Sequence, residues 1–150
     1  MKGRGWLVAR VSLTALTFLS TLIGPHSNLR FFEDPDPVLG VLGVVLLVGF
    51  QVLVWPVMFL FVLGIQALNP RSARTWVYPT WHDNPFDFSQ PLRFFHMVVF
   101  MMAAAAIGAA LSALWQPFEP VWDVGGPLGM ALGGWLGLQV VWRVCAWKHQ

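Results

Sequence analysis

Long apolar runs alternate along the chain with short segments that hold almost all of its charged residues. Four runs approach or exceed the length of a membrane crossing, and they cover residues 6–24, 38–68, 93–115 and 126–147. A helix needs about 20 residues to cross a hydrocarbon core of roughly 30 Å, because it rises about 1.5 Å per residue. The pattern therefore predicts an all-α integral membrane protein, folded as one four-helix transmembrane bundle over residues 1–150.

The second run is too long for one straight crossing. As a helix, residues 38–68 would reach roughly 46 Å, well beyond the core. Pro56 lies inside this run, removes a backbone donor and clashes with the carbonyl of Val52 one turn earlier. We therefore expect a long second helix that is kinked at Pro56.

The first run carries a charge, Arg10, close to its start. The long stem of Arg10 allows its guanidinium to reach the same interface as Lys2 and Arg4. A basic start followed by an apolar stretch also fits a cleaved signal peptide, but no small-x-small cleavage site follows Gly24. The pattern favours a retained first helix, with cleavage of residues 1–24 as the alternative.

The composition agrees with a membrane location. Hydrophobic residues make up 57% of the chain and charged residues 11%, whereas soluble domains carry roughly 25% charged residues. A single cysteine, Cys145, excludes an internal disulfide and a zinc site built on several cysteines. The basic residues never cluster, so the net charge of +2 does not indicate a nucleic-acid partner.

Eight of the nine basic residues fall on one side of the four predicted crossings. They lie at the N-terminus, in the loop over residues 69–93 and at the C-terminal end: Lys2, Arg4, Arg10, Arg71, Arg74, Arg93, Arg143 and Lys148. The opposite side has only Arg30, among several carboxylates. The positive-inside rule therefore predicts that both termini and this loop are cytoplasmic, and we expect a bacterial inner membrane.

The strongest local pattern is a row of glycines four residues apart in the last run: Gly125, Gly129, Gly133 and Gly137. Such a row lets a neighbouring backbone approach closely and gain van der Waals contact that lipid tails do not match. The third run offers small residues in return, including Ala105, Ala109 and Ala113 in one row and Gly108 in the next. We expect the third helix to pack on the fourth, and the surplus of small rows indicates a further helix, from this chain or a partner.

The loop over residues 69–92 is rich in aromatic residues, so we expect it to be ordered and to lie at the membrane interface. His82, Asp83 and Asp87 match no known spacing of metal ligands. Turn and cap roles explain Asp83, Asn84 and Ser89 instead. We therefore predict neither a metal nor a catalytic role for these side chains.

Few polar side chains lie inside the predicted crossings. Gln51 is deep in the second run, and His96 lies about one turn into the third. Polar groups at such depth mark ion paths in many membrane proteins, so these two residues are candidates to line a path. A transporter normally has more polar lining than this.

Neither a phosphate-binding glycine loop nor a nucleophile elbow nor a His/Glu metalloprotease pair is present. The sequence therefore favours a non-enzymatic protein without a cofactor, which acts by helix contact with another membrane protein or with itself. An accessory subunit of a membrane complex and an immunity protein against a membrane-inserting toxin both fit. The first alternative is a small homo-oligomeric channel or transporter, and the second is a membrane enzyme that uses the 69–92 loop.

Overall fold

A computed structural model describes residues 2–24, 37–67, 77–87, 90–118 and 120–147 of the chain. These residues form four α-helices and one π-helical turn, joined by turns and irregular segments. The helices are α1 (Lys2–Ile23), α2 (Pro37–Ala67), α3 (Pro91–Ser112) and α4 (Gly126–Trp147), and the π-helical turn is η2 (Pro120–Gly125).

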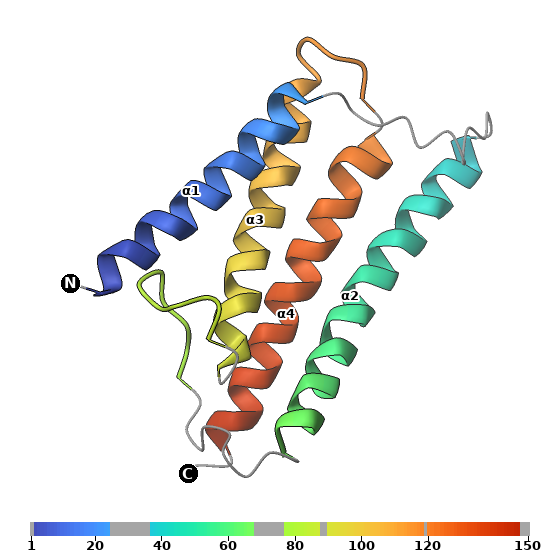
Figure 1. Cartoon of the computed structure of the whole chain (residues 1–150). Coiled ribbons are helices and arrows are strands. Elements are labelled where there is room, and N and C mark those ends of the chain that lie inside the picture. Colours follow the sequence, from blue (N-terminus) through green and yellow to red (C-terminus); the bar gives the residue numbers. More distant parts are fainter. Residues whose placement is uncertain (1, 25–36, 68–76, 88–89, 119, 148–150) are drawn as a thin grey trace.

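All four predicted helices are present (Figure 1). Each is long and apolar enough to cross a membrane, with candidate spans Gly3–Ile23, Val41–Met58, Leu92–Ser112 and Trp122–Arg143. The long second helix is confirmed as one continuous helix that runs through Pro56. Its kink stays a prediction.

The start and the end of α3 differ from the sequence expectation. Gln90 is the N-cap and makes no side-chain cap bond, and Pro91 follows in the first turn. Ser89, the predicted N-cap, lies outside the described residues. The helix ends at Ser112, earlier than predicted, because the amides of the next residues turn back to carbonyls of the last turn.

The helices form an open row in the order α1, α3, α4, α2 (Figure 1). Among the described helices, extensive packing joins α1 to α3, α3 to α4 and α4 to α2. This arrangement differs from the expected compact bundle, in which each helix would have two neighbours around a shared core. Two helices that are consecutive in the chain, α1 and α2, therefore lie at opposite ends of the row.

A hydrophobic cluster of the described chain lies where three helices meet. It consists of Leu92, Phe95, Leu138 and Val141, with Trp55 and Tyr78 packed against it. The rings of Trp55 and Phe95 meet edge to face, with centroids 5.3 Å apart. This cluster joins α2, α3 and α4.

Large apolar side chains cover the outward faces of the helices. Among the α2 side chains that the structure describes, ten are at least half exposed: Val41, Leu42, Val45, Leu46, Phe50, Leu53, Val57, Met58, Leu60 and Phe61. Monomeric soluble proteins rarely expose so large a contiguous apolar surface. The surface is typical of helices that are surrounded by lipid.

Candidate functional site

The glycine row of α4 lies against the backbone of α2. A Cβ atom added to Gly133 would come within 2.6 Å of the carbonyl oxygen of Gln51 and 2.8 Å of the Cα of Val52. At Gly129 the nearest atoms of α2 would be 3.3 Å away, and at Gly137 3.6 Å. Only glycine therefore fits at Gly133, where the two backbones approach most closely.

The third helix packs on α4 as expected, but it does not meet the glycine row. It meets a different face, where a Cβ added to Gly134 would lie 2.7 Å from Cγ2 of Val99. Gly125 lies in η2, and the nearest described atom to an added Cβ there would be the carbonyl oxygen of Pro120, at 3.5 Å. The partner of the row is therefore α2, and three of its four predicted members contact it.

The small residues of α3 serve a second neighbour, α1. A Cβ added to Gly108 would collide with the hydroxyl of Thr21 and lie 2.6 Å from the carbonyl oxygen of Phe18. The alanines of the adjoining row are buried or half-buried: Ala105, Ala109 and Ala113. The row of Gly108 thus packs on a further helix of the same chain, α1.

The described part of the loop, residues 77–87, lies beside the N-terminal half of α1 and the start of α3 (Figure 1). On the α1 side, a Cβ added to Gly3 would be 3.5 Å from the Cβ of His82. The rings of Trp6 and Phe86 meet edge to face, with centroids 6.5 Å apart. Residues 77–87 thus make defined contacts with α1, while the order of the whole loop and its place at the membrane interface stay predictions.

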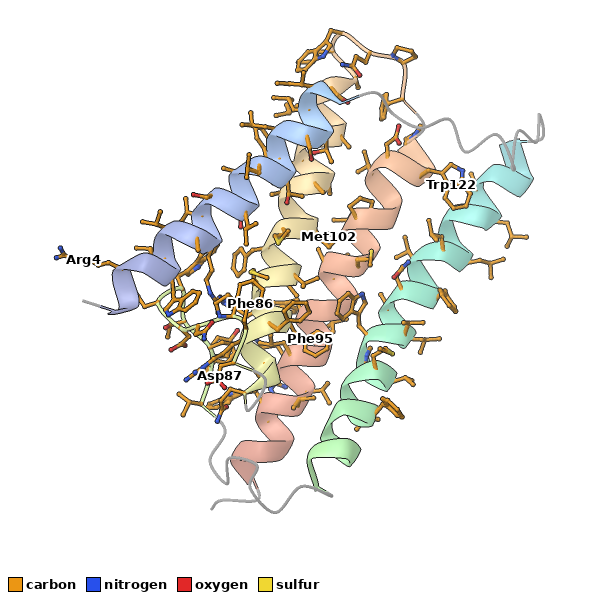
Figure 2. All side chains as sticks on the ribbon, in the orientation of Figure 1. Arg4, Phe86, Asp87, Phe95, Met102 and Trp122 are labelled. Carbon is orange, nitrogen blue, oxygen red and sulfur yellow. The ribbon has the colours of Figure 1, made fainter. Side chains whose placement is uncertain are left out.

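Aromatic side chains hold the other side of the loop to α3 and α4. The rings of Trp81 and Phe100 lie 4.7 Å apart. The ring of Tyr78 meets that of Trp142 at 5.6 Å, and Gln139 donates a hydrogen bond to the Tyr78 hydroxyl at 3.1 Å. The segment thus contacts three helices, and Figure 2 shows its side chains gathered beside α3.

Arg10 lies at the centre of these contacts and is fully buried. Its Nε donates to the carbonyl oxygen of Asp83 at 3.0 Å, and its Nη2 donates to the carbonyl oxygen of Arg93 at 3.1 Å. Its Nη1 lies 2.9 Å from Nδ1 of His96. Since a guanidinium only donates, Nδ1 accepts this bond and the neutral ring carries its proton on Nε2. The sequence predicts that the Arg10 guanidinium reaches water at the membrane interface. In the structure the guanidinium is surrounded by protein groups instead.

One face of α1 changes partner along its length. Gly3, Trp6 and Arg10 share this face at spacings of three and four residues, and they contact the loop. Farther along, Phe18 and Thr21 contact α3 at Gly108. The spacing of Arg10 within this row is the one signal in the sequence that it faces inward, and the sequence analysis missed it.

Most hydroxyl groups of α1 bond to the backbone of their own helix. Thr14 donates to the carbonyl oxygen of Arg10 and Thr17 to that of Leu13, each at 2.8 Å. Thr21 donates to carbonyls of the preceding turn. The donors of these three hydroxyls are therefore satisfied within α1 itself.

The predicted turn roles of the loop residues are confirmed at two positions. The carboxylate of Asp83 accepts bonds from the backbone N–H and the hydroxyl of Thr80, at 2.7 and 3.0 Å. The side-chain oxygen of Asn84 accepts a bond from the N–H of Phe86 at 3.0 Å. Short polar side chains thus satisfy the backbone donors of these turns.

The two carboxylates of the loop also hold Arg93. Its guanidinium donates to Asp87 at 2.8 Å and lies 3.7 Å from the second oxygen of Asp83. His82 is exposed beside Gly3. Among the residues that the structure describes, no three His, Cys, Asp or Glu side chains come together as metal ligands would. The carboxylates are thus engaged in ion pairs.

The pKa of the Asp83 carboxyl lies below its usual value. Partial burial acts to raise the pKa, but the two bonds from Thr80 and the positive charges of Arg93 and Arg10 outweigh burial. Asp83 is therefore ionised at neutral pH and stabilises the turn and the ion pair in that form.

The two candidates for a polar path lie in different seams. The stem of Gln51 lies against Gly129, where α2 meets α4. His96 is buried where α3 meets α1 and the loop. One copy of the chain therefore does not bring these side chains together.

Comparisons with protein-family models, curated proteins and solved structures found no match to this chain.

Proposed function

We propose that the chain is an integral protein of a bacterial inner membrane that acts without catalysis, through helix contacts with another membrane protein or a second copy. The open row of helices is the observation that carries this proposal. Among the described α-helices, α1 packs extensively on α3 and α2 on α4, and both outer helices present apolar surface elsewhere. A helix of a partner has room to pack at either end of the row.

Hydrogen bonds between polar groups within the chain support a helix-contact protein more than a channel or transporter. Arg10, Gln139 and most hydroxyls of the described spans bond within the chain. A path for ions or polar substrates needs polar groups that face a shared lumen. The separation of Gln51 from His96 also weighs against a path through one copy. Ion flux through reconstituted vesicles that is lost in Gln51→Leu would favour the homo-oligomeric channel instead.

The bonding of the loop carboxylates weighs against the membrane enzyme. Asp83 and Asp87 are engaged with Arg93, and Asp83 also closes a turn. An enzyme that relied on these groups with His82 would need them to face a substrate.

The distribution of basic residues supports cytoplasmic termini, since eight of nine lie on the side of the termini and the loop. A contact protein in the inner membrane could be an accessory subunit of a membrane complex or an immunity protein against a membrane-inserting toxin, and the proposal includes both roles. A gene for an immunity protein normally adjoins the gene for its toxin.

Photo-crosslinking in cells tests the proposal. A photoreactive residue is placed at Leu16 of α1 or Leu53 of α2, which are 62% and 68% exposed, and as a control at Leu138, which is 2% exposed. We expect an adduct of defined mass with a membrane protein, or with a second copy, from at least one exposed position and none from Leu138. Adducts with lipid alone at both exposed positions would contradict the proposal.

A further inference from the structure

Gln51 carries an amide near the middle of the candidate membrane span on α2. It lies ten residues after Val41 and seven before Met58, the ends of the candidate span on α2. At 1.5 Å per residue these separations are about 15 Å and about 10 Å. Among the described residues its amide has no hydrogen-bond partner. Since hydrocarbon supplies none, the described part of a single chain leaves this group unsatisfied in a membrane.

The Gln51 side chain is placed at the rim of the seam between α2 and α4. Its Cβ and Cγ would lie 3.3 and 3.5 Å from a Cβ added to Gly129, so its stem packs on α4. The residue as a whole is half-buried. Its amide is thus anchored at one end and open to a molecule that approaches α2 from outside.

Gln51 belongs to a row of α2 residues whose spacing is typical of a contact between two helices. Its members follow one another at intervals of four, three, four and three residues: Leu47, Gln51, Val54, Met58 and Phe61. This is the heptad spacing that keeps one face of a helix against a partner helix. Met58 and Phe61 are 50% and 64% exposed, and Leu47 and Val54 are half-buried. The row adjoins the face that packs on α4, which includes Val48 and Val52.

The chemistry of this row suits a second copy of the same chain. An amide both donates and accepts, so two Gln51 side chains can bond to each other reciprocally. A two-fold axis along the membrane normal places both at the same depth and closes the contact as a dimer. The other members of the row are apolar, so the row offers nothing to a charged partner.

We infer that a second copy packs on α2 along this row, with the two Gln51 amides hydrogen-bonded across the two-fold axis. A single polar residue in an apolar helix seam fixes the register of the two helices, since any shift separates the amides. The inference deepens the proposed function, on which it rests, by naming the second copy as a partner and α2 as its contact.

Disulfide cross-linking in vesicles tests the geometry. The native Cys145 is replaced by serine, and single cysteines are placed at Val54 and Met58 on the row. Leu53 and Val57 are the controls, because they are 68% and 63% exposed and lie about 100° around the same helix. We expect dimers from at least one row position and none from the controls. Equal cross-linking at all four positions would show random collision and overturn the inference.

The variant Gln51→Met tests the role of the amide, because methionine keeps the length of the stem. We expect it to raise the dissociation constant of the dimer about threefold to thirtyfold, measured by energy transfer between labelled copies in vesicles. Gln51→Asn keeps an amide and should retain part of the affinity. The thermal stability of the monomer in detergent should not fall, because the amide has no partner within the described chain.

An unchanged dissociation constant in Gln51→Met, or a less stable monomer, would overturn the inference. Its failure is distinguishable from failure of the proposed function. If no energy transfer occurs but photo-crosslinks join the chain to another membrane protein, the proposed function stands and this inference fails. If energy transfer is absent and the exposed positions capture lipid alone, both fail.

Discussion

Nη1 of Arg10 donates a hydrogen bond to Nδ1 of His96 across 2.9 Å, although the residues lie 86 positions apart in the chain. The bond joins α1 to α3, and the other two bonds of the same guanidinium reach backbone carbonyls of the loop and of the first turn of α3. A buried charge is costly unless protein groups replace its water shell. Here three acceptors do so, and α1, α3 and the loop are held together through one side chain.

Replacement of Arg10 by methionine should therefore destabilise the protein. The change leaves three acceptors without their donor, and hydrogen bonds to charged groups contribute about 1.5–3 kcal/mol each, not additively. Because the cost of burying the charge is also removed, we expect a loss of about 2–4 kcal/mol in the free energy of unfolding, measured by denaturant titration in detergent. Arg4→Met is the matched control, since Arg4 is exposed on the same helix. Equal stability of the two variants would contradict the role of Arg10.

Stability in detergent should also fall in acid through Asp83. Its pKa is lower in the folded chain than in the unfolded chain, where it is about 3.9. Its contribution to stability is therefore fully present above the unfolded pKa, and it is lost as the pH falls through the folded pKa. Thermal unfolding from pH 6 down to about pH 3 should show this loss, and Asp83→Asn should show a smaller one. An identical pH dependence in the variant would exclude Asp83 as a contributor.

The sequence predicted the four helices and two of the loop's turns because both depend on local pattern. Runs of apolar residues fix the helices, and the aromatic and turn residues fix the loop, as Asp83 and Asn84 illustrate. The order of the helices could not be predicted this way. Small residues on several faces of α3 indicate that helices pack closely on it, but they do not identify those helices. The glycine row that includes Gly133 would accept α2 as well as α3 as its neighbour.

The contacts of Arg10 escaped prediction for a related reason. Its partners lie 73 to 86 positions away, in a loop and a helix whose placement depends on the order of the helices. Arg10 lies near the start of α1, and a long side chain at such a position can reach either water or a neighbouring part of the protein. The row it shares with Gly3 and Trp6 favours protein only once a neighbour on that face is known.

The proposed orientation predicts the sides of the membrane on which segments lie. Reporter fusions after Arg74 and after Gln150 should both report the cytoplasm, because eight of nine basic residues lie on that side. A fusion after Asn28, in the segment between the first two helices, should report the opposite side and serves as the control. A periplasmic signal after Arg74 or Gln150 would exclude the orientation.

The seam between α4 and α2 should reject even one added methyl group at Gly133. A Cβ there would lie 2.6 and 2.8 Å from backbone atoms of Gln51 and Val52, which have no rotamer by which to move aside. The two helices would have to separate, and overpacking of this kind costs about 1–3 kcal/mol. We therefore expect Gly133→Ala to lower the midpoint of thermal unfolding in detergent.

The matched control for that substitution is Gly49→Ala in α2, where an added Cβ would meet nothing within 4 Å. Alanine is favoured over glycine inside a helix by about 0.5–1 kcal/mol, so Gly49→Ala should be neutral or stabilising. Gly134→Ala should fall between the two, because its added Cβ meets a side-chain methyl group of Val99 and no backbone atom. Close contact between the backbones thus predicts a loss that decreases from Gly133 through Gly134 to Gly49. If all three variants unfold at the same temperature, then α4 does not touch α2 at Gly133, and the order of helices in the row must be revised.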